Sequence, residues 1–365
     1  MPRNEAWWNP YRMVPVRDEV ERHAPLTHEK FSGESGVLHC FLENLTPLCV
    51  GRETHGSQVQ FFVRGRECRI PGSSLKGMLR SLAELVGGGC NVVGTAPPPP
   101  HAPCNNARNL CIACRTFGMM ERQGNARVHL GKATVSDALL EGEGRGQTFE
   151  MYPGSPRATH AAFYLNPATE QNDRRCRKMY FHMPARREAP LPIPAKIPPG
   201  ARARNTKNLQ SLLAGHRFSF RVSFESLEPG ELDLLLYVLT LEENVEVVLE
   251  ETGLELQGPM RHKLGMGKAV GMGSCRIGIE RWEALPSGRE RFASLIPVAR
   301  EMREGEALRQ RVAERTTPYV QDRSATMTQL RKMMVWDERD ARTFRYPEYH
   351  WFRAPGNSET PLKRI

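Results

Sequence analysis

The sequence contains no apolar run long enough to cross a bilayer, and its first residues contain no apolar core of a secretory signal. These absences exclude membrane spans of the usual kind and lead us to expect a cytoplasmic protein with no membrane partner. Aromatic residues are scarce, at 7% of the chain. The aromatic signature with which RNA-recognition motifs stack bases is absent, so base stacking on a sheet is not expected.

Familiar catalytic motifs are absent too. The sequence has no HExxH pair, no nucleophile elbow and no paired-carboxylate motif. The remaining candidates lie in the loop 48–58, where Glu53 could help to bind a metal and His55 could act as a general base in RNA cleavage. The simpler interpretation is that both, with Arg52, are polar loop residues close to phosphate.

Positive charge is in excess. Lysine and arginine number 51 against 41 acidic residues, which gives a net charge of +10 and an isoelectric point near 9.3. An acidic partner is therefore expected, and nucleic acid is commoner in that role than an anionic membrane surface. The length of 365 residues fits one large domain or two smaller ones.

Four of the nine cysteines are clustered. Cys104, Cys111 and Cys114 follow a C-x6-C-x2-C spacing, and Cys90 precedes them across a proline run. In a reducing compartment such clusters more often bind metal than form disulfides, and four thiolates complete a tetrahedral structural zinc site. His101 is an alternative to Cys90 as the fourth ligand, and four free cysteines in a loop remain the alternative to a zinc site.

The segment Ile70–Arg80 (IPGSSLKGMLR) predicts a glycine–serine turn that leads directly into an amphipathic helix. The first N–H groups of a helix have no partner within the helix, and anions bind there. The residues that we expect to hold phosphate are Gly72, Ser73, Ser74, Lys76, Gly77 and Arg80. The alternative is a surface helix capped by Ser73 or Ser74.

A second glycine cluster covers residues 264–273 (LGMGKAVGMG). It is no dinucleotide fingerprint, because Val270 replaces the third glycine, and no phosphate loop, because Ala269 follows Lys268. A cationic loop that follows a phosphodiester backbone and a hairpin without a ligand both remain open. The candidate RNA contacts here are Gly265, Gly267, Lys268 and Gly271, with the flanking Arg261, His262 and Lys263; elsewhere they are Arg115, Arg174, Arg175, Arg177 and Lys178.

Alternating apolar residues predict strands at 37–43 and 217–225, and each is followed by a helix and further strands. This repeated pattern predicts an α+β fold with a ferredoxin-like (RRM-like) sheet. The expected segments are an N-terminal arm at 1–35, a first half of the sheet domain at 36–140 with the zinc knuckle at 90–118, a long insertion at 141–216, a second half at 217–283 and a helical extension at 284–365.

Several motifs, taken in order, resemble the RAMP superfamily, the backbone subunits of CRISPR effector complexes, and especially those of type III. They are Ile70–Gly77 with Arg80, Cys111–Gly118 and the loop Gly265–Gly273. The openings Asn9–Tyr11 and Asn44–Leu48 look like a type III-D-related branch. The resemblance covers about residues 9–282.

The resemblance implies a ferredoxin-like palm with a thumb-like insertion at 141–216 that kinks the guide–target duplex. It also implies several copies stacked along a guide RNA and a structural zinc knuckle. Target-cleaving relatives carry an aspartate in the loop after the first strand, whereas loop 48–58 contains only Glu53 as an acid. We therefore expect a subunit that presents complementary target RNA without cutting it, beside a 5′-end-capping RAMP subunit and a separate nuclease, as in type VII. The alternatives are an endonuclease that uses Glu53 or His55, and a zinc-stabilised RNA-binding protein outside CRISPR.

Overall fold

The computed structural model has a mixed α+β fold with mainly antiparallel sheets. It describes residues 9–29, 32–53, 57–65, 67–91, 99–121, 126–152, 160–164, 176–194, 197–250, 252–293, 295, 298–348, 350–354 and 356, without the side chains of 52, 53, 161, 162, 201, 203, 204, 292 and 353. No helix in these ranges is long and apolar enough to cross a bilayer.

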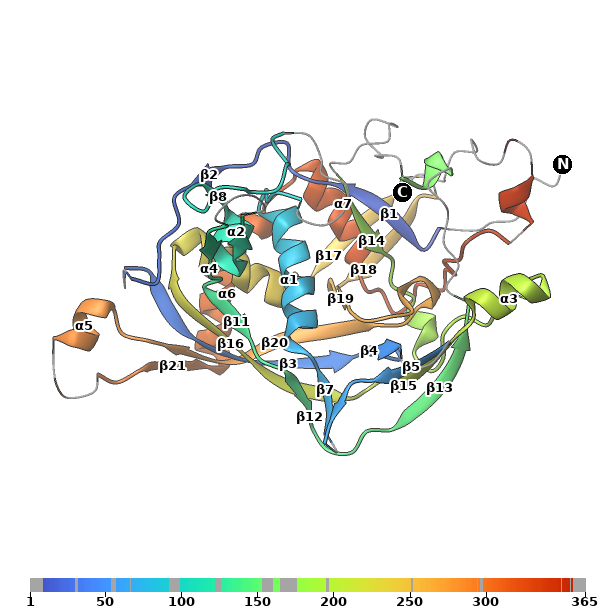
Figure 1. Ribbon diagram of the computed structural model, residues 1–365, viewed down its shortest axis with the longest axis horizontal. Coiled ribbons are helices and arrows are strands. Elements are labelled where there is room, and N and C mark those ends of the chain that lie inside the picture. Colours follow the sequence, from blue (N-terminus) through green and yellow to red (C-terminus); the bar gives the residue numbers. More distant parts are fainter. Residues whose placement is uncertain are drawn as a thin grey trace.

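A nine-stranded antiparallel sheet forms the centre of the molecule (Figure 1). Alternate side chains of each strand point into the core of the sheet. Leu38 lies opposite Val222 and Leu42 opposite Phe218, and all four are buried. The strand order is β19 (His262–Lys263), β20 (Ser274–Ala284), β3 (Glu34–Asn44), β16 (Arg217–Leu227), β12 (Ala138–Leu140), β7 (Glu67–Ile70) and β6 (Val63–Arg64), with β11 (Ala133–Val135) beside β16 and β21 (Glu301–Glu304) beside β20.

Helices α1 (Gly72–Val86) and α4 (Pro229–Thr240) pack against each other on one face of this sheet (Figure 1). The apolar stripe of α1, which includes Leu75 and Leu79, is fully buried. A capping box of Glu228 and Glu231 begins α4. The remaining helices are α2 (Ile112–Phe117), α3 (Pro199–Asn205), α5 (Gly288–Phe292), α6 (Gly305–Val320) and α7 (Ala325–Met334).

Smaller sheets surround this centre. The sheet of β13 (Gly146–Met151), β15 (Lys207–Leu212), β5 (Gln58–Phe61) and β4 (Gly51–Glu53) contains one parallel pair, β15 with β5. The two-stranded pairs are β1 (Tyr11–Pro15) with β14 (Cys176–Tyr180), β2 (Arg22–His23) with β8 (Leu110–Cys111), β9 (Met119–Met120) with β10 (Val128–His129), and β17 (Val245–Leu249) with β18 (Leu254–Gly258). The short 3-10 turns are η1 (Ala161–Tyr164), η2 (Pro184–Arg186), η3 (Lys268–Val270) and η4 (Trp351–Arg353).

The elements with strong periodicity lie where the sequence predicts them. The strands predicted at 37–43 and 217–225 lie within β3 and β16, and helices begin at Gly72 and Pro229. Residues 128–140 contain three short strands, β10, β11 and β12, which residues 130–132 and 136–137 separate.

The terminal and inserted segments are more ordered than their composition indicates. The expected irregular arm contains β1, which pairs with β14 inside the segment 141–216. Other strands of that segment, β13 and β15, pair into the sheet of β4 and β5. The C-terminal extension contains the helices α5, α6 and α7, as predicted, but also the strand β21, which joins the central sheet beside β20. After Met334 its described residues contain only the turn η4.

Candidate functional site

Three segments that are far apart in the sequence meet at a hollow of about 480 Å³, which we call the lysine pocket. Helix α1 contributes Ser74 and Gly77, strand β14 contributes Lys178, and the loop 264–273 contributes Gly265 and Lys268. Lys263 at the end of β19 also lines it. In Figure 1 these elements lie around the middle of the molecule. The pocket thus unites the two glycine motifs and part of the basic cluster.

The lysines of this pocket have no carboxylate partner among the described residues. Lys263 Nζ donates a hydrogen bond to Ser274 Oγ at 2.9 Å, and burial lowers the pKa of Lys263 to about 7. Lys178 is an exposed residue, and its ammonium group lies 3.7 Å from the ring centre of Tyr11. Loss of solvation there lowers the pKa of Lys178 to about 8.

Burial also lowers the pKa of Lys268. Three ammonium groups that lose water without gaining a counter-ion are held in an unfavourable state. An anion that entered the pocket would stabilise these ammonium groups by supplying the opposite charge that they lack. The electrostatics of the pocket therefore favour a ligand with closely spaced negative groups, such as a phosphodiester chain.

The glycine loop is fixed against the segment that follows β3. Met266 N–H donates to the carbonyl of Cys49 at 2.9 Å, and Gly273 N–H donates to the carbonyl of Pro47 at 2.9 Å. Gly265 has a φ of +79°, and a Cβ atom there would lie 2.4 Å from the Cys49 oxygen. Only glycine fits this position, so the loop keeps a backbone surface beside the lysines.

The N-terminus of α1 differs from the expected open anion site. The N–H of Gly72 donates to Asp137 Oδ1 at 2.9 Å, and neither Ser73 nor Ser74 caps the helix with its side chain. A carboxylate from the turn between β11 and β12 therefore occupies one of the donors that the sequence assigned to phosphate. The half-buried Lys76 has no carboxylate partner among the described residues.

Several cations predicted to bind RNA have partners inside the protein. Each is held by a carboxylate, a carbonyl or both, so none of them belongs to the unpaired group of the lysine pocket. They are Arg80 with Glu84 and the Gly118 carbonyl, Arg115 with Glu231 and the Leu110 carbonyl, Arg177 with Glu84, Arg261 with Glu243, and His262 with the Val238 carbonyl. Burial lowers the pKa of His262 to about 4.

The remaining residues that the sequence predicts to contact RNA either shape the glycine loop or lie outside the described residues. Gly267 and Gly271 bound the turn η3 with φ values of +73° and +97°, and Gly271 lies against the side chain of Arg186. The side chains of Arg52 and Glu53, and the whole of His55, Arg174 and Arg175, lie outside the described residues.

The cysteine cluster is a candidate metal centre. The sulfur atoms of Cys90, Cys104, Cys111 and Cys114 all lie within 4.8 Å of one another, and all four residues are buried. A tetrahedral site with Zn–S bonds of about 2.3 Å places sulfurs about 3.8 Å apart, and the Sγ atoms of Cys90 and Cys114 are 3.6 Å apart. Hydrogen bonds from the neighbouring thiols, that of Cys111 first, lower the pKa of Cys104. The donor set therefore fits a structural zinc ion.

Cys90 rather than His101 completes this cluster. The Nε2 atom of His101 lies 2.6 Å from the carbonyl oxygen of Arg17, in the N-terminal segment. The donor atoms that come together in the cluster are the four cysteine sulfurs, and those of His101 are not among them. Cys90 follows the end of α1 and brings its sulfur to those of the knuckle.

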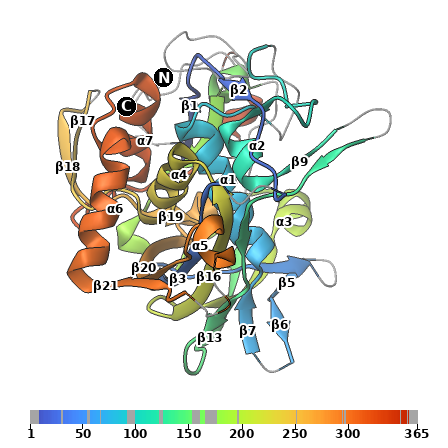
Figure 2. The same cartoon turned by 90° about the vertical axis from the view of Figure 1, so that its left-hand side faces the viewer.

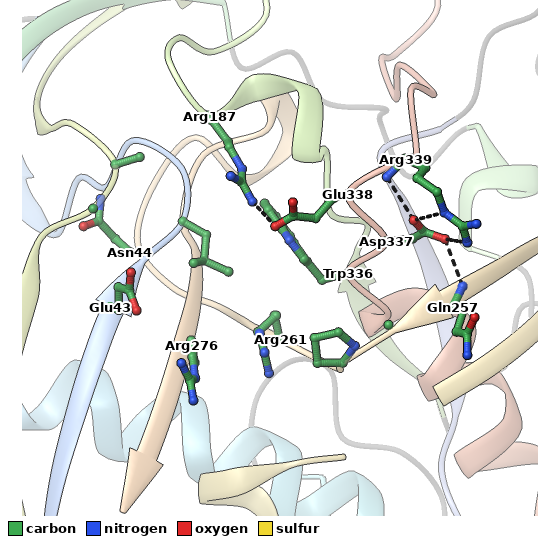
Figure 3. Close-up of a pocket in the computed structure, with 15 residues that line it drawn as sticks. Glu43, Asn44, Arg187, Gln257, Arg261, Arg276, Trp336, Asp337, Glu338 and Arg339 are labelled. Carbon is green, nitrogen blue, oxygen red and sulfur yellow. Dashed lines mark hydrogen bonds and ion pairs between the residues drawn. The ribbon is translucent and has the colours of Figure 1, made fainter. Parts of the chain in front are cut away.

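A second hollow, of about 790 Å³, opens beside the end of β3 (Figure 3). Arginine side chains enter it from several segments, and the guanidinium of Arg187 lies 5.6 Å from the ring centre of Trp336. Three of its arginines are already paired: Arg187 with Glu338, Arg261 with Glu243 and Arg339 with Asp337. Because these carboxylates compete with an incoming anion, the lysine pocket is the better candidate.

Sequence reasoning missed two features of these sites. Asp137 reaches the first N–H of α1, and no local pattern signals this because 65 residues separate them. The completely buried Lys132 pairs with Glu231, which also binds Arg115 of α2. The position of Lys132 within an apolar segment was a signal of this buried ion pair.

The family model of the RAMP superfamily matches residues 41–276, well over half of the chain. The match includes both glycine motifs, the cysteine cluster and the lysine pocket. No curated protein sequence matches the chain. The chain belongs to the RAMP superfamily, whose members are CRISPR-associated RNA-binding proteins.

Proposed function

We propose that the protein is a guide-RNA-binding backbone subunit of a CRISPR effector complex, related to type III-D or type VII. The observation that carries this proposal is the lysine pocket, in which Lys178, Lys263 and Lys268 lie together without carboxylate partners among the described residues. Because the chain belongs to a family of RNA-binding proteins, RNA is the anionic polymer that we expect to bind in this pocket.

Contacts in this pocket would go to the RNA backbone. Ammonium groups and main-chain amides contact phosphates, and such contacts position a nucleic acid without reading its sequence. A backbone subunit must accept any guide, so sequence-independent binding suits that task. The binding would depend steeply on salt, because each phosphate contact releases condensed counter-ions.

We infer that the core of the central sheet is a ferredoxin-like palm. In chain order the elements are β3, α1, β11 with β12, β16, α4 and β20, and the strands take the order β20, β3, β16, β12 in space. Two split strand–helix–strand units with both helices on one face have this arrangement. The lysine pocket lies beside α1 and the loop before β20.

We propose that this subunit presents complementary target RNA and leaves cutting to a separate nuclease. The support is chemical: loop 48–58 has no aspartate, and Glu53 is its single acid. Further copies along the guide and a 5′-end-capping RAMP subunit are the remaining proposed partners. A structural zinc ion held by Cys90, Cys104, Cys111 and Cys114 would order the knuckle without taking part in chemistry.

The test is to purify the protein with its bound RNA and to measure binding of several unrelated guide-length RNAs by fluorescence anisotropy. We expect co-purified repeat-derived RNA, affinities that agree across sequences, and target RNA that stays intact on incubation. A strong preference for one sequence, or no RNA binding at low salt, would contradict the backbone role. Cleavage by the purified complex that is lost in Glu53→Ala or His55→Ala would establish the endonuclease instead.

A further inference from the structure

The four sulfur atoms of the cysteine cluster do not receive their hydrogen bonds in the same way. Three of them accept a backbone N–H from within the cluster: Cys111 from Cys90 at 3.3 Å, Cys90 from Cys104 at 3.4 Å, and Cys104 from Cys111 at 3.4 Å. Cys114 receives no backbone N–H from the described residues. Its Sγ accepts from the guanidinium of Arg80, at 3.4 Å from Nη2.

We propose that Arg80 is a positioning residue of the metal centre, which supplies to the fourth thiolate the hydrogen bond that the backbone supplies to the other three. This inference rests on the metal centre proposed above and replaces the phosphate contact that the sequence predicts for Arg80. A zinc ion with four thiolates carries a formal charge of −2, so a cation against one sulfur stabilises the occupied site.

The guanidinium of Arg80 is held in a fixed orientation. Its Nη1 donates to the carbonyl of Gly118 at 2.8 Å, and its Nε donates to Glu84 Oε1 at 2.9 Å. Gly118 ends the helix α2 that carries Cys114, and the carboxylate of Glu84 is buried. The three partners are bound by the three nitrogens of the planar guanidinium group, Nε, Nη1 and Nη2. The single ammonium nitrogen of a lysine cannot reproduce this arrangement.

The same carboxylate connects the metal centre to strand β14. Glu84 also forms an ion pair with Arg177 of β14. The next residue along this strand is Lys178, which lines the lysine pocket. The chain Cys114–Arg80–Glu84–Arg177 therefore crosses from α2 through α1 to β14. We expect occupancy of the metal centre to help fix the strand that presents Lys178.

The experiment measures zinc affinity by competition with a chromogenic chelator in wild type, Arg80→Gln, Arg80→Lys and Lys76→Gln. Loss of an outer-shell partner typically costs about 10- to 100-fold in metal affinity, so we expect a loss of that size in Arg80→Gln and a smaller one in Arg80→Lys. Lys76→Gln is the matched control, because Lys76 lies one turn away on α1 and should keep wild-type zinc affinity. In the cobalt-substituted protein, the thiolate-to-metal absorption should shift in Arg80→Gln but not in Lys76→Gln.

An unchanged zinc affinity and an unchanged cobalt spectrum in Arg80→Gln would overturn the inference. So would a shallower salt dependence of RNA binding in Arg80→Gln at saturating zinc, because that result assigns Arg80 to a phosphate. If Arg80→Gln does not fold, Arg80→Lys gives the same comparison. Failure of the wild type to bind zinc would instead reject the metal centre itself, which keeps the two proposals distinguishable.

Discussion

At the scale of single residues, Lys263 is the most informative group of the lysine pocket. Its pKa lies near 7 because burial removes water from the ammonium group and no carboxylate among the described residues compensates. Its charge is therefore variable near neutral pH, unlike that of an exposed lysine. The titration of Lys263 should therefore make both the RNA affinity and the stability of the protein depend on pH.

We predict that RNA affinity falls as the pH rises from 6.5 to 8.5, by at most about tenfold per pH unit from Lys263. Only the protonated amine attracts phosphate, so binding must be accompanied by proton uptake above pH 7. Titration calorimetry in buffers of different ionisation enthalpy measures that uptake. The control is Lys263→Arg, which should remain charged and lose the part of the dependence that comes from Lys263, while the part from Lys178, whose pKa burial lowers to about 8, stays; an undiminished dependence in this variant would assign the titration elsewhere.

The same group predicts the pH dependence of stability without RNA. The folded pKa of Lys263 is about 7, below the ordinary lysine value of 10.5, so between these values the unfolded chain binds more protons. Its contribution to the free energy of unfolding therefore becomes more favourable as the pH rises through this range. Urea unfolding at pH 7 and pH 9 should show this increase in the wild type and a smaller one in Lys263→Met.

A buried ion pair allows a prediction about stability. Lys132 and Glu231 are both fully buried, and Arg115 also contacts Glu231 at 3.0 Å. Lys132→Met should lower the free energy of unfolding by about 3 kcal/mol, because it leaves a buried carboxylate short of a partner. Urea unfolding checks this. Arg309→Met, which removes an exposed pair with Glu306, should change it by less than about 0.5 kcal/mol.

Residue roles were only partly predictable from the sequence. The cysteine spacing indicated the cluster, and basic residues beside glycine indicated Lys263 and Lys268, because both signals are local. The partners of Arg80 and Gly72 were not predictable, because Gly118 and Asp137 approach them from elements distant in sequence.

At the scale of elements, the hairpin of β9 and β10 projects from the body (Figure 2). Met120 and Val128 in its strands and Leu130 just after β10 are 66%, 64% and 67% exposed, and the exposed Arg127 precedes β10. In the segment 141–216, which remains the predicted thumb, β14 pairs with β1 and β15 pairs with β5, whereas β13 pairs with β15 of the same segment. We propose that this hairpin also inserts apolar side chains between bases of the guide–target duplex.

Met120→Ser with Val128→Ser should therefore weaken retention of complementary target RNA by about fivefold or more, since an apolar wedge between base steps stabilises a kinked duplex. Binding of the guide alone should be unchanged. Filter binding with guide-loaded protein separates the two. The control Val248→Ser changes an exposed apolar residue in β17; an equal effect there would point to general instability.

The knuckle is the element for which metal removal is predicted to matter most. Its cysteines fasten the end of α1 to β8 and α2. A strong chelator should lower the melting temperature and release about one zinc per chain, following the stoichiometry of four-ligand sites. Cys111→Ser should behave like the stripped protein, whereas Cys68→Ser, outside the cluster, should not. A melting temperature insensitive to chelation would reject a structural metal.

Elements with a strong period were predictable, and those that depend on distant partners were not. The alternation in β3 and β16 and the apolar stripe of α1 reflect burial on one face, which the sequence carries directly. Strand β1 has no such signal, because its pairing with β14 depends on a segment far along the chain.

At the scale of the whole molecule, one pocket unites the features that the sequence displays separately. Its lysines come from β14, from the end of β19 and from the loop between β19 and β20. The zinc knuckle connects through Arg80 and Glu84 to the same strand β14. We therefore expect RNA to bind at a rigid cationic site beside α1, rather than through positive charge spread evenly over the surface.

The most direct test is the salt dependence of guide-RNA binding in the variant Lys178→Met/Lys263→Met/Lys268→Met. For single-stranded RNA each lost phosphate contact reduces the slope of log affinity against log salt by about 0.7, so three contacts predict a slope shallower by about 2. The matched control replaces three arginines outside the pocket by Met, namely the exposed Arg300 and Arg309 and the half-buried Arg311. A triple-lysine variant with the wild-type slope would contradict the claim that this pocket holds the RNA backbone.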